Sequence, residues 1–192
     1  MEFEDGEDYV EDELRSAEEI AKRALVLASL ISVVFELQSI STTIEWLKHE
    51  NLWSELVPSD LAFINDPSNQ KLKIDLSWRS EALVVLLWSI NKLSSLPALT
   101  EQCDTTAIRN AVIAPPNSTK EFIASAKLRS EEEIGNEYEV VYESHWSVRD
   151  AQINKKKIPN NLEPGVVYER HFGFNYVTGY DGLPWDEITT DT

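Results

Sequence analysis

The sequence predicts an all-α protein: a single compact domain of about six to eight helices with a docked C-terminal tail. Apolar residues recur at alternating spacings of three and four along several segments, as they do on one face of an α-helix. Ser-x-x-Glu and Thr-x-x-Glu motifs, which cap helix N-termini, precede several of these segments, and prolines or glycines follow them. The chain has 192 residues, of which 42% are hydrophobic, so it is long enough to bury a sizeable core.

The first predicted helix runs from Leu14 to Phe35. Its apolar stripe is formed by Leu14, Ala17, Ala21, Ala24, Ala28, Ile31 and Phe35. Its first turns carry charged residues on the outer face, whereas its second half is apolar nearly all round. We therefore expect a helix that starts at the surface and enters the core.

Two shorter helices and a turn are expected next. The Thr-x-x-Glu motif at residues 42–45 predicts a second helix, which Pro58 ends. A short helix is predicted over residues 59–64. The cluster Asn-Asp-Pro-Ser-Asn at residues 65–69 is typical of a turn.

A central helix is predicted from Asp75 or Ser77 to about Ser94. It contains seven successive apolar residues, Ala82 to Trp88. With its polar flanks this segment exceeds a typical strand and is rich in helix formers, so we expect a helix that is buried on most sides.

The second half of the chain carries four further helix signals. A short helix is predicted over residues 105–113, and Ser-x-x-Glu motifs begin at Ser118 and Ser130. The helix after Ser130 places Ile134, Tyr138, Val141, His145 and Val148 on one face. The last predicted helix starts at Pro164, a proline suited to a first turn, and ends at Thr178 before Gly179.

The charge balance restricts the classes of partner. The formal net charge is −17, from 34 acidic and 17 basic residues, which argues against binding to nucleic acid or to an anionic membrane. About half of this charge lies in residues 1–13, so we divide the chain into an acidic leader (1–13) and a helical domain (14–192). The leader either keeps the protein soluble or binds a basic partner.

The single cysteine, Cys103, excludes an intramolecular disulfide. The first residues are acidic where a secretory signal would be basic and then apolar. We therefore expect a cytoplasmic protein. We read Cys103 as a half-buried small residue, because the adjacent Asp104 would raise the pKa of its thiol rather than activate it.

Arg79 and Glu81 form the first candidate site, at the start of the most apolar helix. A guanidinium beside a buried segment needs a carboxylate partner. Glu81 is two residues away and points elsewhere, so we expect the partner of Arg79 to come from another segment. The pair either fixes packing or belongs to an anion-binding or catalytic site.

His145 with Arg149, and His171 with Arg170, form the second candidate site. The two histidines lie on separate predicted helices and could meet in the interior. Together with Asp186 or Asp191 they could bind a metal, but the spacing typical of metal sites is missing. A structural polar cluster is the preferred interpretation, and we expect neither a metal nor a cofactor.

The C-terminal tail is expected to dock on the helices through Trp185. We expect Asp186 or Asp191 to pair with Arg79, Arg149 or Arg170 in that position. No hydrolase, dinucleotide, phosphate-loop or catalytic cysteine motif occurs in the sequence.

Several motifs occur in a fixed order from about residue 14 to the end. They are Ala21-Lys22-Arg23-Ala24-Leu25, Trp78-Arg79-Ser80-Glu81, Leu96-Pro97, Cys103-Asp104, His145-Trp146-Ser147-Val148-Arg149, Glu169-Arg170-His171 and Trp185-Asp186. As an ordered set they resemble the bacterial domain-of-unknown-function family 4272. Asn91, where we expect glycine, departs from the family pattern, as do residues 173–176.

The resemblance implies a single helical domain of bacterial origin, without an established activity. It also matches the family's polar positions to Arg23, Arg79, Glu81, His145, Arg149, Arg170, His171, Asp186 and Asp191. All of these residues except the two histidines, together with Trp185, make up the expected structural polar cluster.

Two hypotheses of function stay open. The first is a cytoplasmic binding protein, immunity- or inhibitor-like, that faces a basic protein. The alternative is an enzyme or small-ligand binder with a pocket between helices, lined by Arg79, Glu81, His145, Arg149, Arg170 and His171 and covered by the tail. The sequence favours a protein that is not an enzyme and leaves its oligomeric state open.

Overall fold

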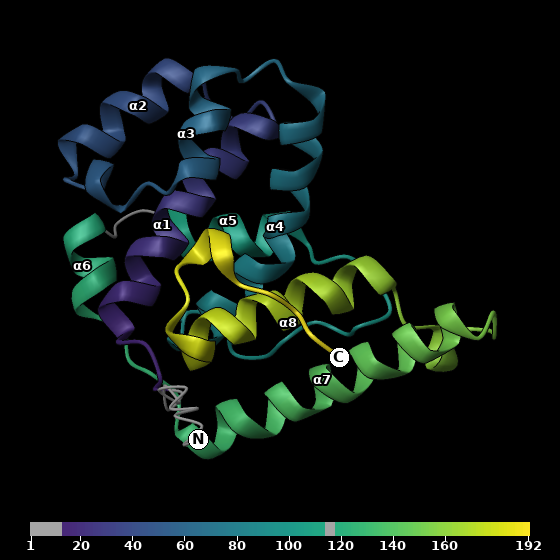
Figure 1. The fold of residues 1–192 in the computed structure, drawn as a ribbon. Coiled ribbons are helices and arrows are strands. Elements are labelled where there is room, and N and C mark those ends of the chain that lie inside the picture. The colour runs from purple at the N-terminus through teal and green to yellow at the C-terminus, as the bar shows by residue number, and fades with distance from the viewer. Residues whose placement is uncertain (1–12, 114–117) are drawn as a thin grey trace, which may run out of the picture.

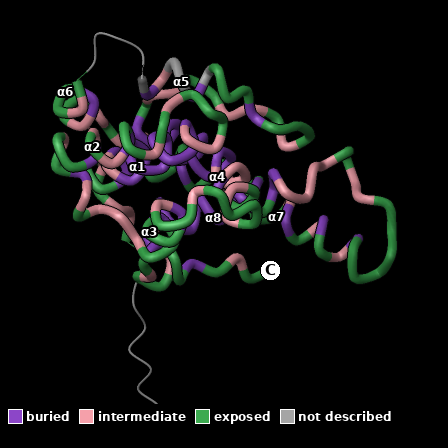
Figure 2. The backbone as a smooth tube through the Cα atoms, turned by 90° about the horizontal axis from the view of Figure 1, so that it is seen from above, coloured by how far each residue is buried: buried purple, intermediate pink, exposed green. Residues whose placement is uncertain are grey.

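Three helices form the centre of the computed structural model, which describes residues 13–113 and 118–192 (Figure 1). They are α1 (Ala17–Val34), α4 (Gln70–Ser89) and α8 (Pro164–Thr178), and α4 packs against both of the others. Buried residues gather where these helices meet, whereas the outer elements are largely exposed (Figure 2). Eight α-helices and no strands are present in the described residues, so the predicted all-α class and helix number are confirmed.

A capping box at Ser16 sets the start of α1. Ser16 Oγ accepts a hydrogen bond from the backbone N–H of Glu19, and a Glu19 carboxylate oxygen accepts one from the N–H of Ser16. The Ser16 hydroxyl also donates to this carboxylate, and the bonds from the hydroxyl and the N–H of Ser16 lower the pKa of Glu19. The helix therefore begins three residues after Leu14, and Arg15 instead donates from its backbone N–H to the carbonyl of Val177.

The second helix, α2 (Ile40–His49), begins earlier than predicted. Its N-cap is Ser39, whose side chain accepts from the N–H of Thr42. The predicted N-cap at Thr42 is therefore wrong: the N–H of Thr42 is already bound by the Ser39 side chain, so Thr42 lies inside the helix. Pro58 does not end this helix: α2 stops at His49 and a short 3₁₀ turn follows at Trp53–Glu55.

Pro58 instead begins α3 (Pro58–Asn65), in the first-turn position where a missing N–H costs nothing. The central helix α4 also starts earlier than Asp75, because Asn69 caps it by accepting from the N–H groups of Lys71 and Leu72. It ends at Ser89 rather than Ser94. Asn91, beyond its end, has a φ of 60°, a left-handed conformation that glycine adopts freely and asparagine tolerates.

The remaining helices lie where they were predicted. They are α5 (Thr105–Ile113), α6 (Thr119–Ala124), α7 (Glu131–Ile153) and α8. Capping boxes at Ser118 and Ser130 start α6 and α7. Gly179 ends α8 with a φ of 70°. A short 3₁₀ turn at Pro159–Asn161 lies between α7 and α8, and two more, Tyr180–Gly182 and Trp185–Glu187, follow α8.

The C-terminal tail docks on α8, as predicted. Trp185 is buried and packs edge-on against Phe172 and Tyr176, with ring centroids 4.9 Å away in both cases. Asn175 Nδ2 donates to the carbonyl of Thr189 at 2.7 Å. These contacts hold the tail across α8 and near α1 (Figure 1).

The acidic leader lies outside the described residues apart from Glu13. Two residues after Glu13, Arg15 donates to the carbonyls of Tyr176 and Leu183. Among the described residues, no helix has both the length and the apolar character needed to cross a membrane.

Candidate functional site

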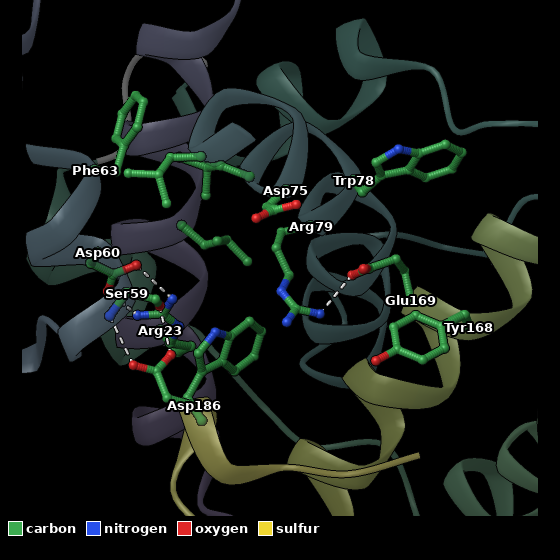
Figure 3. Close-up of a pocket in the computed structure, with 14 residues that line it drawn as sticks. Arg23, Ser59, Asp60, Phe63, Asp75, Trp78, Arg79, Tyr168, Glu169 and Asp186 are labelled. Atoms are coloured by element: carbon green, nitrogen blue, oxygen red, sulfur yellow. Dashed lines mark hydrogen bonds and ion pairs between the residues drawn. The ribbon is translucent and has the colours of Figure 1, made fainter. Parts of the chain in front are cut away.

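A cavity of about 550 Å³ opens between α1, α3, α4, α8 and the C-terminal tail (Figure 3). We call it the Arg79 cavity. Aliphatic side chains from α1 and α4 and the Phe63 ring form part of its wall. Its charged lining residues are Arg23, Asp60, Asp75, Arg79, Glu169 and Asp186.

Arg79 projects from α4 into the middle of this cavity (Figure 3). Its Nη1 lies 2.8 Å from Glu169 Oε2 on α8, which confirms that its partner comes from another segment. Its guanidinium lies over the Phe172 ring, with Cζ 3.6 Å from the ring centroid. The side chain remains 27% exposed. Among the described residues, Glu169 is its one hydrogen-bond acceptor, so most of its N–H groups are available to a ligand.

Glu169 is the more buried member of the pair. Burial raises the pKa of its carboxyl group above the usual value, and the neighbouring Arg79 charge opposes this effect. The carboxyl group can therefore accept a proton more readily than an exposed glutamate. Loss of the Arg79 contact would raise its pKa further.

Arg23 and Asp60 form a buried ion pair at one side of the cavity. Two parallel hydrogen bonds join them, Nη1 to Oδ2 at 2.5 Å and Nη2 to Oδ1 at 3.0 Å. Arg23 Cζ lies 4.4 Å from the centroid of the Trp185 ring. Its Nε–H is buried and has no acceptor in the described part of the chain. Of the two arginines that line the cavity, the partly exposed Arg79 is therefore the one whose donors a ligand can reach.

The rest of the cavity wall is aromatic and acidic. Tyr168 and Trp78 flank Glu169 (Figure 3). Trp78 fits there because Gly165 has no side chain: a Cβ at Gly165 would lie 2.6 Å from the Trp78 ring. Asp75 is exposed and pairs with Lys71, with Nζ 2.6 Å from Oδ2.

Glu81 and Arg170 lie outside this cavity lining and form a sealed ion pair. Arg170 Nη2 and Nε lie 2.9 and 3.1 Å from Glu81 Oε2, and Arg170 Nη1 donates to the carbonyl of Pro97. The other Glu81 oxygen accepts from the N–H of Cys103 at 2.7 Å. Burial, and then the Glu81 charge, raise the pKa of the Cys103 thiol to about 12. The expected direction was correct, although its main cause is burial rather than Asp104.

The two histidines meet in the interior, as the sequence suggested. His145 Nδ1 and His171 Nδ1 lie 2.8 Å apart, so one of them must be the donor and the other the acceptor. Burial, followed by the His145 charge, lowers the pKa of His171 to about 4. Burial, followed by Arg149, lowers the pKa of His145. Both rings are therefore uncharged at neutral pH.

The predicted candidate pocket is thus divided. Arg79 lines the Arg79 cavity, whereas Glu81 of α4 and Arg170 of α8 pair with each other outside it. Neither histidine lines this cavity. Tyr168 connects the two regions, because it lines the cavity and its ring centroid lies 5.7 Å from that of His145. Arg149 lies on the exposed face of α7.

The expected pairing of the tail acids with arginines is wrong. Asp186 accepts hydrogen bonds from Ser59, from its N–H at 2.8 Å and its Oγ at 2.6 Å. The N–H groups in the first turn of a helix lack partners within the helix and attract a carboxylate, which explains the preference for α3. Asp191 accepts from Thr189 Oγ1 at 2.9 Å.

The four metal candidates do not come together. Asp186 is hydrogen-bonded to Ser59 of α3, whereas Asp191 lines a different cavity with His171. Within residues 13–113 and 118–192, no group of three or more His, Cys, Asp or Glu side chains is placed to hold a metal ion.

Several residues of the Arg79 cavity were missed as site residues, among them Asp60, Tyr168 and Glu169. In the sequence, Asp60 was interpreted only as part of the start of a short helix. Glu169 belongs to the Glu169-Arg170-His171 motif. Only Arg170 and His171 were taken as candidate site residues, because arginine and histidine more often take part in binding or catalysis. A helix projection would have placed it one turn from Gly165 and toward α4.

The chain matches a family model over residues 5–188, and the family is described as a domain of unknown function (DUF4272). Neither the curated proteins nor the solved structures include a match to this chain.

Proposed function

This chain belongs to the family of the domain of unknown function DUF4272, and we propose that it binds a small carboxylate with an aromatic or apolar body in the Arg79 cavity. One observation carries the proposal. Arg79 is held in an open cavity by one carboxylate and by the Phe172 ring, and its remaining donors have no acceptor within residues 13–113 and 118–192.

The ligand's carboxylate would bind at the Arg79 guanidinium. An arginine fork matches the two oxygens of a carboxylate, and such charge-assisted hydrogen bonds are the strong ones. The packing of Arg79 on Phe172 restricts its side chain in advance, so less side-chain entropy is lost on binding. Trp185 of the tail forms part of the same wall, and its ring centroid lies 5.8 Å from Arg79 Cζ.

Glu169 is the internal competitor for Arg79. A ligand carboxylate that takes over Arg79 would stand beside the Glu169 charge unless Glu169 binds a proton. Its raised pKa makes that proton uptake easier. The site can therefore accept an anion although its surroundings are acidic.

The body of the ligand would lie against the apolar and aromatic wall. Trp78, Tyr168 and Trp185 line the cavity together with leucines of α1 and α4. Ligand pockets typically combine such a wall with few polar groups that fix orientation.

Isothermal titration calorimetry with 3-phenylpropionate tests the proposal, with 3-phenylpropanamide and 3-phenylpropylamine as uncharged and cationic counterparts. We expect the carboxylate to bind with a dissociation constant on the order of 1 mM, and the other two more weakly. Arg79→Gln should weaken binding by about tenfold or more. Glu169→Gln should tighten it, because it removes the competing charge.

Arg149→Gln is the matched control, since it removes an exposed arginine of α7 that lies outside the cavity. Its affinity should equal that of the parent protein. Equal affinities for carboxylate and amide, or an Arg79→Gln protein that binds as the parent does, would contradict the proposal.

A basic protein partner in the cytoplasm stays a prediction. What supports it is the outer face of α7, where six glutamates are exposed: Glu131, Glu132, Glu133, Glu137, Glu139 and Glu143. Titration against a panel of basic proteins at low and high salt tests it, and deletion of residues 1–13 separates the leader from the body. The hypothesis fails if no salt-sensitive complex forms.

A further inference from the structure

A second cavity, of about 400 Å³, lies between α7, α8 and the end of the tail. We call it the α7–tail cavity. It shares no lining residue with the Arg79 cavity, so the inference drawn from it is independent of the proposed function. Its lining includes Tyr138, Tyr142, His171, Asn175 and Asp191.

Asn175 offers this cavity an unused acceptor. Its side chain is 2% exposed, and its Nδ2 donates to the carbonyl of Thr189 at 2.7 Å. That bond fixes the orientation of the amide, because the oxygen could not donate in its place. Asn175 Oδ1 is buried and has no hydrogen-bond partner in the described residues. A buried amide oxygen without a donor is unfavourable, and a ligand N–H would relieve it.

The charges and rings around Asn175 favour a cation. Asp191 contributes a carboxylate, one oxygen of which accepts from Thr189 Oγ1. The rings of Tyr138 and Tyr142 lie side by side, with centroids 6.2 Å apart, and the faces of such rings attract cations. Tyr142 is 39% exposed, so this side of the cavity can be reached from solvent.

The histidine pair on the inner side does not oppose a cation. His171 lines the cavity, and its Nδ1 is occupied by His145. Both rings are uncharged at neutral pH because burial lowers the pKa of each. They therefore add polar surface without a positive charge.

We propose that the α7–tail cavity binds the ammonium group of a primary alkylamine, with Asn175 Oδ1 accepting one of its N–H groups and Asp191 balancing its charge. A quaternary ammonium ion is disfavoured, since it has no N–H for Asn175. The same chemistry is present in a free alkylamine and in a lysine side chain of another protein.

Titration of the full chain with butylammonium, followed by NMR of the histidine and tyrosine rings, tests the site. We expect saturable shifts of the His171 and Tyr142 signals, and none with tetramethylammonium. A peptide with one lysine, compared with its acetylated form, is the second arm. Butylammonium binding without lysine-peptide binding assigns the site to a free amine, and binding of both assigns it to a protein side chain; either result supports the site.

Two variants make the test specific. Asp191→Asn should weaken butylammonium binding at least about fivefold, equivalent to ~1 kcal/mol. Glu139→Gln is the matched control: it removes one exposed acid from α7 outside the cavity and should leave the affinity unchanged. Asn175→Leu, checked for native NMR dispersion, should abolish the shifts. The proposal is overturned if butylammonium gives no saturable shift, if tetramethylammonium binds equally well, or if Asp191→Asn and Glu139→Gln have equal effects.

Discussion

Arg170 and Glu81 join α8 to α4 through an ion pair in which both side chains are 1% exposed and Nη2 lies 2.9 Å from Oε2. Removing one charge of a buried pair leaves the other uncompensated. We therefore expect Glu81→Gln to lower the free energy of unfolding by about 3–5 kcal/mol. Urea denaturation followed by circular dichroism measures this change.

The double variant Glu81→Met/Arg170→Met separates the cost of an unpaired charge from the value of the pair. It should regain much of the stability that Glu81→Gln loses, because no charge is left buried. A double variant less stable than Glu81→Gln would show that the pair itself, rather than its imbalance, stabilises the fold.

The histidine pair should make the fold sensitive to acid. The pKa of His171 is about 4 in the folded protein and 6.5 when unperturbed. The unfolded state thus binds more protons in this interval, and stability is lost as the pH falls from about 6.5 to 4. We expect a loss of a few kcal/mol over that range, measured by urea denaturation at several pH values.

His171→Gln should remove much of this pH dependence. His49→Gln is the matched control, because His49 is a highly exposed histidine of α2. Its stability should follow the same pH profile as the parent protein. A His171→Gln profile that coincides with the parent profile would refute the assignment.

Two glycines in helices should respond in opposite directions to alanine. A Cβ at Gly135, in α7, meets no atom within 4 Å, so Gly135→Ala should stabilise the protein by roughly 0.5–1 kcal/mol. A Cβ at Gly165 would overlap the Trp78 ring, so Gly165→Ala should displace that ring and destabilise the protein. Thermal unfolding compares the two variants, and tryptophan fluorescence should change only in Gly165→Ala.

Ligand binding in the Arg79 cavity should be linked to proton uptake. When a carboxylate displaces Glu169 from Arg79, the pKa of Glu169 rises further, so the complex holds more protons than the free protein. Affinity for 3-phenylpropionate should therefore increase as the pH is lowered from neutrality. Calorimetry in two buffers of different ionisation enthalpy measures the uptake. It should vanish in Glu169→Gln; an equal buffer dependence in both proteins would be incompatible with this role.

The helices could be predicted wherever a cap and an apolar period agree. Both signals are present for α8, between Pro164 and Gly179, and its bounds were correct. The start of α2 was misplaced because Thr42 rather than Ser39 was taken as the N-cap, and that of α4 because Asn69 was taken as part of a turn. Cap and turn sequences use the same residue types, so a sequence alone does not separate them.

The site could be predicted only in part, for a geometric reason. The need of Arg79 for a partner follows from its place beside a buried segment, but the identity of that partner depends on how α8 is rotated toward α4. That rotation brings Glu169 to Arg79 and, one residue later, Arg170 to Glu81. Asp186 was misassigned because the free N–H groups of α3 compete with arginines for its carboxylate.

A crystal structure of the protein with 3-phenylpropionate bound tests the role of Arg79 most directly. The account predicts the carboxylate within hydrogen-bond distance of the Arg79 guanidinium, the phenyl ring against the aromatic wall, and Glu169 moved from its contact with Nη1. A carboxylate bound elsewhere, or a ligand in the cavity with the Arg79–Glu169 pair intact at its present 2.8 Å, would contradict it.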